Sequence, residues 1–218
     1  MKIKEIFTSI QGEGSYIGYK QLFIRLCGCN LNCKYCDTDY KISNSKDYSV
    51  DELISICNNN LDCHSLALTG GEPLLNIEFL KYFIPKSPLP VYLETNGTLC
   101  KELLEIIDFI QYIAADIKLP SCTGGSPLWD EHKEFFTIAS QKNLFAKAVF
   151  DNNINDFEIH KMCNLCKEFD IELILQPMMK DNALSVNSDF IITTLNKCLK
   201  IYPNVRVIPQ VHKFINVL

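Results

Sequence analysis

The sequence predicts an α/β fold built on a mostly parallel sheet, and three features of the 218-residue chain support this prediction. Apolar runs of strand length alternate six times with longer segments of amphipathic, helical pattern. The apolar runs are nearly continuous, as expected of strands buried on both faces of a parallel sheet. No Pro-, Gly- or Ser-rich linker divides the chain, so residues 1–218 are expected to form one domain. The sheet is expected to be open or curled toward a barrel.

The predicted strands are runs rich in Leu, Ile, Val, Phe and Tyr. In chain order they are Ile3–Thr8, Leu22–Cys27, Ser65–Thr69, Val91–Thr95, Phe109–Lys118, Leu144–Phe150, Glu172–Gln176 and Val205–Pro209. The first helix is expected to begin at Ser49, a good N-cap with Asp51 and Glu52 in the turn that follows. The remaining helices are expected over Asn76–Ile84, Lys101–Ile107, Asp130–Lys142, Asn155–Phe169 and Asn187–Lys200. In such folds the working residues gather where parallel strands end.

Composition excludes several classes of protein. Lys and Arg number 21 and Asp and Glu number 26, a formal net charge of −5, which argues against binding nucleic acid by bulk charge. No apolar run approaches the roughly 18 residues of a membrane helix. The segment Met1–Glu5 lacks the apolar centre of a signal peptide, so a reducing cytoplasm is expected. The eleven cysteines are then expected to bind metal or to pack in the core.

Three cysteines follow the second predicted strand at a spacing of three and then two residues: Cys29, Cys33 and Cys36. Three thiolates on one loop can hold three corners of a cubane iron–sulfur cluster and leave the fourth iron open. A zinc site is the alternative, because Cys163 and Cys166 could supply further ligands. That pair lies inside a predicted helix, however, where residues three apart share a packing face. A non-catalytic metal module also remains open at this point.

The triplet, together with Thr69-Gly70-Gly71-Glu72-Pro73 after the next strand, resembles the radical S-adenosylmethionine (SAM) superfamily. Within that superfamily the chain resembles the 7-carboxy-7-deazaguanine synthase family over residues 3–213. The segments that carry this resemblance are Phe7–Gly14, Gly18, Phe23–Leu26, Gly28–Leu31, Tyr35–Thr38, Glu94–Thr98 and Pro209–Lys213.

The resemblance implies a shortened, partly open (β/α) barrel and a homodimer. It implies a carbon–nitrogen lyase of queuosine biosynthesis that converts 6-carboxy-5,6,7,8-tetrahydropterin to 7-carboxy-7-deazaguanine with loss of ammonia. The cofactors would be a [4Fe-4S] cluster, SAM and Mg²⁺, with a flavodoxin or ferredoxin as electron donor and a 5′-deoxyadenosyl radical as the reactive species. No catalytic nucleophile is expected, because the cofactor carries the radical. Asp116-Ile117-Lys118 resembles instead a motif of radical-SAM activating enzymes, which install a glycyl radical on a partner protein; this is the alternative function.

The resemblance also assigns site residues. The cluster ligands would be Cys29, Cys33 and Cys36, and Thr38 would contact Mg²⁺. Residues implied to contact SAM are Tyr35, Cys36, Asp37, Gly71, Glu72, Asp116, Ile117, Lys118 and Gln176. Residues implied to contact the substrate are Ile10, Gln11, Gly12, Glu13, Arg25, Thr69 and His212.

The residue types suit these roles. Glu72 could take an ammonium group, and Arg25 on a strand could hold a carboxylate with two hydrogen bonds. The hydroxyl of Thr38 suits Mg²⁺ completed by waters and a substrate carboxylate. Structural interpretations stay open beside these: Arg25 as a surface residue, Thr38 as a loop cap and His212 as a packed side chain. The other cysteines are expected to be structural: Cys27, Cys57, Cys63, Cys100, Cys122, Cys163, Cys166 and Cys198.

Overall fold

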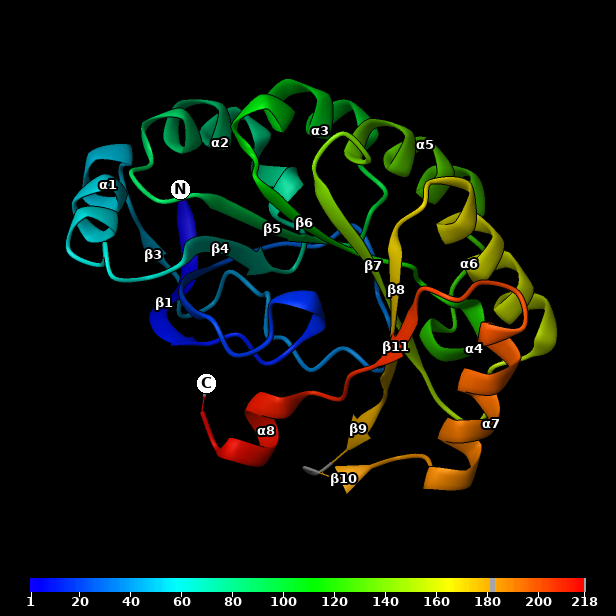
Figure 1. Ribbon diagram of the computed structural model, residues 1–218. Coiled ribbons are helices and arrows are strands. Elements are labelled where there is room, and N and C mark those ends of the chain that lie inside the picture. The colour runs from blue at the N-terminus through cyan, green and yellow to red at the C-terminus, as the bar shows by residue number, and fades with distance from the viewer. Residues whose placement is uncertain (181–182, 218) are drawn as a thin grey trace.

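A computed structural model describes residues 1–180 and 183–217 and shows a strongly curved sheet with helices on its outer face (Figure 1). The sheet has nine strands, in the spatial order β11-β8-β7-β6-β5-β4-β2-β1-β3. Their bounds, in that order, are Val205–Val207, Glu172–Pro177, Asn143–Phe150, Tyr112–Asp116, Val91–Thr95, Ser65–Gly70, Lys20–Leu26, Lys2–Ile10 and Lys46–Asp47. A separate pair is formed by β9 (Met179–Lys180) and β10 (Ala183–Leu184).

The run from β2 to β11 is parallel throughout, whereas β1 pairs antiparallel with both β2 and β3. Strands β11 and β3 are the two edges of the sheet, so the barrel does not close. This confirms the predicted fold class, a partly open α/β barrel of mostly parallel strands.

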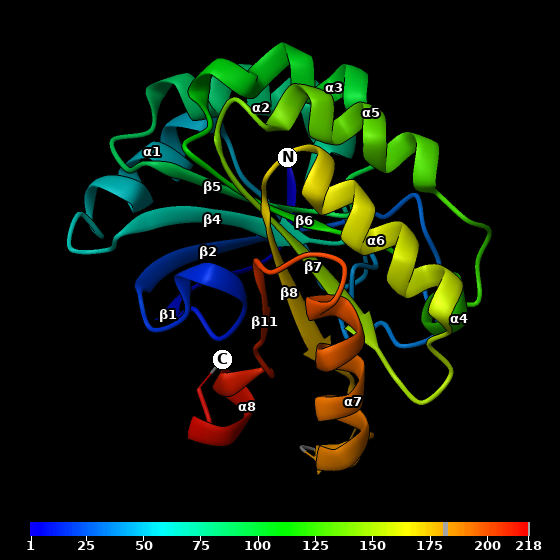
Figure 2. The ribbon, with the colours of Figure 1, turned by 45° about the vertical axis from the view of Figure 1, so that its right-hand side comes forward.

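The helices follow the convex face of the sheet (Figures 1 and 2). The longer ones are α1 (Val50–Asn58), α2 (Ile77–Phe83), α3 (Cys100–Ile106), α5 (Trp129–Ala139), α6 (Asp156–Glu168) and α7 (Ser188–Leu199). Two short helices, α4 (Pro120–Thr123) and α8 (Val211–Ile215), were not predicted. Helix α8 lies apart from the convex layer, below the sheet in Figure 1. Within the residues described, no helix is long and apolar enough to cross a membrane.

The predicted elements agree with the structure apart from a few boundaries. Ser49 caps α1 through a capping box with Glu52, as expected. Strand β6 starts later than predicted, because Ile107–Phe109 forms a 3₁₀ turn, and β11 ends at Val207. The eight cysteines outside the triplet are buried, which confirms the prediction that they are structural.

The core has two parts, one on each face of the sheet. The larger part packs the helices against the outer face. The smaller part fills the inside of the curved sheet, and Tyr16 from the loop after β1 packs into it, with its ring centroid 4.6 Å from that of Tyr112. The strand residues of this inner cluster, one from each of six neighbouring strands, are Phe23, Ala67, Tyr92, Ala114, Phe145 and Ile174.

Candidate active site

The inner cluster positions a second layer of side chains, two residues further along each strand. Because alternate residues of a strand point to the same face, the residue two positions on also faces the inside of the curved sheet. In all six strands it is polar, and it lies in the C-terminal half of the strand: Arg25, Thr69, Glu94, Asp116, Lys147 and Gln176. All six line cavities at this edge. The apolar layer is thus the floor of the site and the polar layer is its working surface.

Two adjoining compartments make up the cavity. The cysteine compartment lies under the loop that carries the triplet, and includes Cys29, Cys33 and Cys36 in its wall. The arginine compartment lies between Arg25 and the C-terminal segment. Six residues line both compartments and therefore separate them: Glu13, Asp37, Thr38, Thr69, Glu94 and Gln210.

The residues predicted to contact the substrate and those predicted to contact SAM fall largely in different compartments. All seven residues predicted to contact a substrate line the arginine compartment: Ile10, Gln11, Gly12, Glu13, Arg25, Thr69 and His212. Seven of the nine residues predicted to contact SAM line the cysteine compartment: Tyr35, Cys36, Asp37, Gly71, Asp116, Lys118 and Gln176. The side-chain oxygen Oε1 of Gln176 is buried there without a hydrogen-bond partner, as expected of a group that contacts a ligand.

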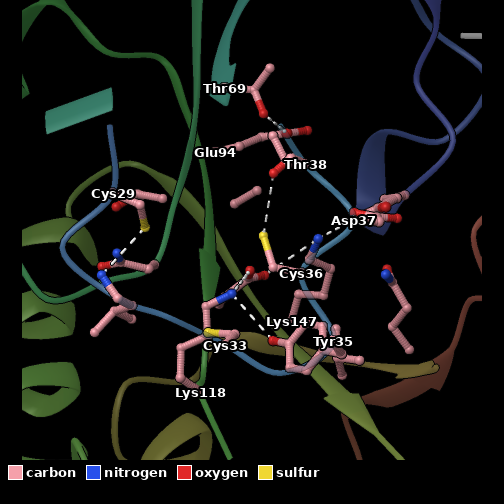
Figure 3. Close-up of a pocket in the computed structure, with 18 of the residues that line it drawn as sticks. Cys29, Cys33, Tyr35, Cys36, Asp37, Thr38, Thr69, Glu94, Lys118 and Lys147 are labelled. Carbon is pink, nitrogen blue, oxygen red and sulfur yellow. Dashed lines mark hydrogen bonds and ion pairs between the residues drawn. The ribbon is translucent and has the colours of Figure 1, made fainter. Parts of the chain in front are cut away.

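The triplet has the donor set of an iron–sulfur site. Its three thiols are partly or fully exposed, whereas the other cysteines are buried, and among the described residues no fourth cysteine lines this compartment. Burial raises the pKa of Cys29 and of Cys33, and the nearby Lys118 opposes the rise, so metal binding must displace their protons. Figure 3 shows Cys29, Cys33 and Cys36 spread apart around the cavity, and in the described chain no three His, Cys, Asp or Glu side chains converge on one point. The residue types fit a cluster with one open iron.

Gly71 lets the end of β4 pass directly beside the start of the cysteine loop. A Cβ atom at this position would lie 1.8 Å from the carbonyl oxygen of Gly28, which is backbone and cannot move aside cheaply. The next residue, Glu72, donates its N–H to the same carbonyl at 2.8 Å. The glycine motif therefore fixes the cysteine loop against the strand end.

Glu72 itself does not line the cavity, contrary to its predicted role as a SAM contact. Its side chain is fully buried, and its carboxylate accepts hydrogen bonds from the N–H groups of Leu74 and Asn96 and from the Thr95 hydroxyl, at 2.7–3.1 Å. Burial raises the pKa of Glu72 to about 7. Through these hydrogen bonds the carboxylate holds the segment after β4 against the end of β5.

Ile117 also lies away from the cavity, and its side chain packs in the outer core. Strand alternation explains this, because Asp116 and Lys118 on either side of it both face the cavity. Its backbone N–H donates to the Lys147 carbonyl at 2.7 Å, which extends the pairing of β6 with β7. His132 accepts from the Lys118 N–H at 3.0 Å and so fixes the following turn.

A chain of alternating charges crosses the polar layer of the cavity. Glu13 pairs with Lys147, whose Nζ also lies 3.4 Å from Oδ1 of Asp116. The other oxygen of Asp116 accepts from Lys118 at 2.6 Å, and Lys118 Nζ lies 3.3 Å from the Tyr35 hydroxyl. Burial alone raises the pKa of Glu13 and of Asp116. Lys147 and the Gln210 side chain beside Glu13, and Lys118 and Lys147 beside Asp116, outweigh burial and hold both pKa values below their ordinary range. Both carboxyl groups are therefore ionised at neutral pH.

Glu94 is the acidic group shared by both compartments that sequence reasoning did not select. Its carboxylate accepts hydrogen bonds from the side chains of Gln11, at 2.8 Å, and Thr69, at 2.6 Å. Burial raises the pKa of Glu94 despite these donors. The second N–H of the Gln11 amide donates to Gln21, and its carbonyl oxygen accepts from the Glu13 N–H, so Gln11 orients Glu94 rather than offering a free donor.

The C-terminal segment closes the arginine compartment through three contacts. The Val211 N–H donates to the Gly12 carbonyl at 2.8 Å, and the Gln210 side chain donates to Glu13 at 2.7 Å. Lys213 pairs with Asp37 at 2.8 Å, directly after the cysteine triplet. These contacts tie the two loops of the cavity to one short segment.

We expect Gly12→Ala to release this segment. The added Cβ would lie 2.3 Å from His212 Nδ1 and 2.6 Å from the His212 backbone nitrogen, so α8 must move. Loss of such contacts, about 1.4 kcal/mol, predicts roughly tenfold faster amide hydrogen exchange at residues 210–217. Gly125→Ala is the matched control, because its Cβ would meet only Thr123 Oγ1 at an ordinary 3.7 Å. Unchanged exchange in Gly12→Ala would show that this contact does not hold α8.

Comparisons with known proteins agree with this arrangement. Residues 23–144 match the radical SAM superfamily. The 7-carboxy-7-deazaguanine synthase of Geobacter sulfurreducens is 34% identical, over 100% of this chain and 98% of its own length. That of Archaeoglobus fulgidus is also 34% identical, over 98% of this chain and 97% of its own. The crystal structure of QueE from Escherichia coli superposes with a TM-score of 0.67 over 97% of this chain and 94% of that one, at 20% identity, and so shares the fold.

Proposed function

The chain belongs to the 7-carboxy-7-deazaguanine synthase family of the radical SAM superfamily, and on this premise we propose how its cavity serves the reaction. It is a radical SAM lyase of queuosine biosynthesis. The substrate we propose is 6-carboxy-5,6,7,8-tetrahydropterin, which is converted to 7-carboxy-7-deazaguanine with loss of ammonia. The relatives' names do not favour the alternative of an activating enzyme.

The division of the cavity is the observation that carries this proposal. A cysteine compartment and an arginine compartment adjoin and share one wall, so two ligands can lie side by side with their reacting atoms close together. The superfamily's [4Fe-4S] cluster and SAM belong in the first and the pterin in the second. When bound, the reduced cluster supplies the electron that splits SAM and starts the reaction on the substrate ring.

The side chains of the cysteine compartment bind and orient. Cys29, Cys33 and Cys36 would hold three irons, which leaves one for SAM. Asp116 lies at a strand end with an ionised carboxylate, and Gln176 has a free carbonyl oxygen, so both can accept hydrogen bonds from SAM.

In the arginine compartment, Arg25 is the cation available for the pterin carboxylate. Its Nε lies 3.0 Å from Oε2 of Glu5 without the angles of a hydrogen bond, and this half-exposed partner leaves much of the guanidinium for a ligand. Phe7 and Phe23 stack at 5.1 Å beside it and give the compartment a flat aromatic wall. The amino and ring N–H groups of a pterin need acceptors, and Glu94 and Glu13 supply them.

Thr38 is the residue we propose for Mg²⁺. It lines both compartments, so a metal ion bound to its hydroxyl would lie next to the substrate carboxylate. One hydroxyl leaves most of the coordination to water and to the substrate, which suits Mg²⁺. A divalent ion there would neutralise carboxylate charge during the ring contraction.

The test is anaerobic turnover by the reconstituted protein. With reductant, SAM, Mg²⁺ and carboxytetrahydropterin it should release ammonia and a deazaguanine chromophore, and it should hold about four irons per chain. SAM cleavage without pterin turnover would contradict the substrate assignment. A colourless protein holding one zinc would contradict the cluster assignment.

Further elements of the proposal concern partners and location. We propose a homodimer, to be checked by light scattering, and a flavodoxin or ferredoxin as electron donor. No nucleic acid or membrane takes part. The eleven free cysteines fit a reducing compartment, which supports the cytoplasm as the location.

A further inference from the structure

Lys147 is the one lysine of β7, and its ammonium joins a residue of each compartment. On one side it pairs with Glu13, which lies in the loop after β1 and lines both compartments. On the other side it pairs with Asp116 at the end of β6, which lines the cysteine compartment. In the part of the chain that the structure describes, no other side chain pairs with both carboxylates.

The burial of Lys147, Glu13 and Asp116 limits how far these three side chains can move. The exposed fractions of the Lys147, Glu13 and Asp116 side chains are 13%, 18% and 20%. A buried carboxylate is costly unless it is paired, so the shared ammonium stabilises both carboxylates in their present positions. Glu94 adds a third negative group near Lys147. One cation therefore fixes the separation between Glu13, which lines both compartments, and Asp116, which lines the cysteine compartment.

Removal of the ammonium should loosen this arrangement without unfolding the protein. Glu13 keeps its hydrogen bond from Gln210 at 2.7 Å, and Asp116 keeps Lys118 at 2.6 Å. Each carboxylate thus has one partner left. Their mutual repulsion, no longer screened by the lysine, would move Glu13 and the loop after β1 away from β6.

We propose that Lys147 is a positioning residue that sets the placement of the pterin relative to SAM by fixing Glu13 to Asp116. The proposal rests on the proposed function, because it assigns the ligands of the two compartments. Transfer of a hydrogen atom between two bound molecules requires their reacting atoms in contact, and a displacement of about 1 Å can cost about 10²-fold in rate. Lys147 would act through Glu13 and Asp116 rather than by touching the reacting atoms.

The experiment uses the reconstituted enzyme and three variants. Lys147→Met keeps most of the side-chain volume and removes the charge, and Lys147→Arg restores a cation. Lys197→Met is the matched control, because Lys197 forms an exposed pair with Asp156 at 2.6 Å on the outer helices. Iron content and thermal melting show that each variant is folded and loaded.

The first readout is binding with the cluster left oxidised, so that nothing turns over. The affinity for carboxytetrahydropterin is measured by calorimetry with and without SAM. We expect SAM to strengthen pterin binding at least fivefold in the wild type and in Lys197→Met, and by less than twofold in Lys147→Met. Lys147→Arg should recover part of this coupling. Equal coupling in the wild type and Lys147→Met would overturn the proposal.

The second readout is the ratio of 5′-deoxyadenosine to deazaguanine product under turnover. We expect the ratio to rise about tenfold in Lys147→Met, because SAM cleavage continues while hydrogen transfer from the misplaced pterin becomes slow. Equal loss of both products would mean a merely structural role and would also overturn the proposal. A wild type that binds the pterin without converting it would contradict the proposed reaction only, since the binding readout still decides the role of Lys147. A wild type that binds no pterin would overturn both.

Discussion

We expect Cys33→Ala to abolish SAM cleavage and to leave the purified protein nearly free of iron. Cys33 is the middle thiol of the triplet, and two remaining thiolates cannot hold a cubane that already lacks a fourth protein ligand. Its side chain is partly exposed to the cysteine compartment, so the substitution itself should cost little stability. Iron analysis, the visible absorption of the cluster and 5′-deoxyadenosine release are the measurements.

Cys27→Ala is the matched control for the loss of a thiol in the same loop. Cys27 lies two residues before the triplet, but its side chain is buried and does not line the cysteine compartment. We expect this variant to keep about four irons and its SAM cleavage, at the modest stability cost of a small buried cavity, about 1 kcal/mol. Retention of iron by Cys33→Ala, or its loss in Cys27→Ala, would show that the ligands have been assigned to the wrong thiols.

The sheet and the location of the site could be predicted because both depend on local patterns. Near-continuous apolar runs mark buried parallel strands wherever they occur. The cysteine triplet and the Gly70-Gly71 motif follow such runs directly, and parallel strands end at the same edge. Capping residues such as Ser49 and Asn155 likewise fix helix starts through contacts only three residues apart.

The direction of individual side chains at the strand ends was harder to predict. A shift of one residue reverses which face a side chain occupies, and a sequence motif does not show where alternation resumes after a strand. Ile117 and Glu72 were therefore assigned to the cavity although both side chains turn into the protein. Alternation counted from Asp116 and Lys118 would have excluded Ile117.

Two working residues, Lys147 and Glu94, and one short helix, α8, were not predicted from the sequence. Lys147 stands inside an apolar strand with no motif around it, and only the register of the sheet puts it opposite Asp116. A two-residue step from Phe145, in the apolar floor, would have found it, as the same step from Tyr92 finds Glu94. Helix α8 could not be predicted, because its five residues lack a side-chain hydrogen bond at the N-cap and depend on contacts with distant segments.

Arg25→Ala should weaken binding of the carboxytetrahydropterin about 10²-fold while SAM binds as in the wild type. A charge-assisted, two-pronged contact with a carboxylate contributes about 3 kcal/mol, which corresponds to that factor. Arg25 lines the arginine compartment and not the cysteine compartment, so its loss should leave the SAM contacts in place. Calorimetric titration with each ligand separately measures the two affinities.

The chain has only two arginines, and the second provides the control. Arg206 forms an exposed pair with Glu172 on β8, outside both compartments, so Arg206→Ala should leave both affinities unchanged. Arg25→Lys keeps the positive charge but removes the planar guanidinium that makes two hydrogen bonds. We therefore expect it to weaken pterin binding by an intermediate factor of about ten. If Arg25→Ala weakened the binding of pterin and of SAM equally, the substitution would have displaced the end of the strand. Arg25 lines only one compartment, so its loss cannot change the binding of a ligand in the other compartment unless the wall between them moves.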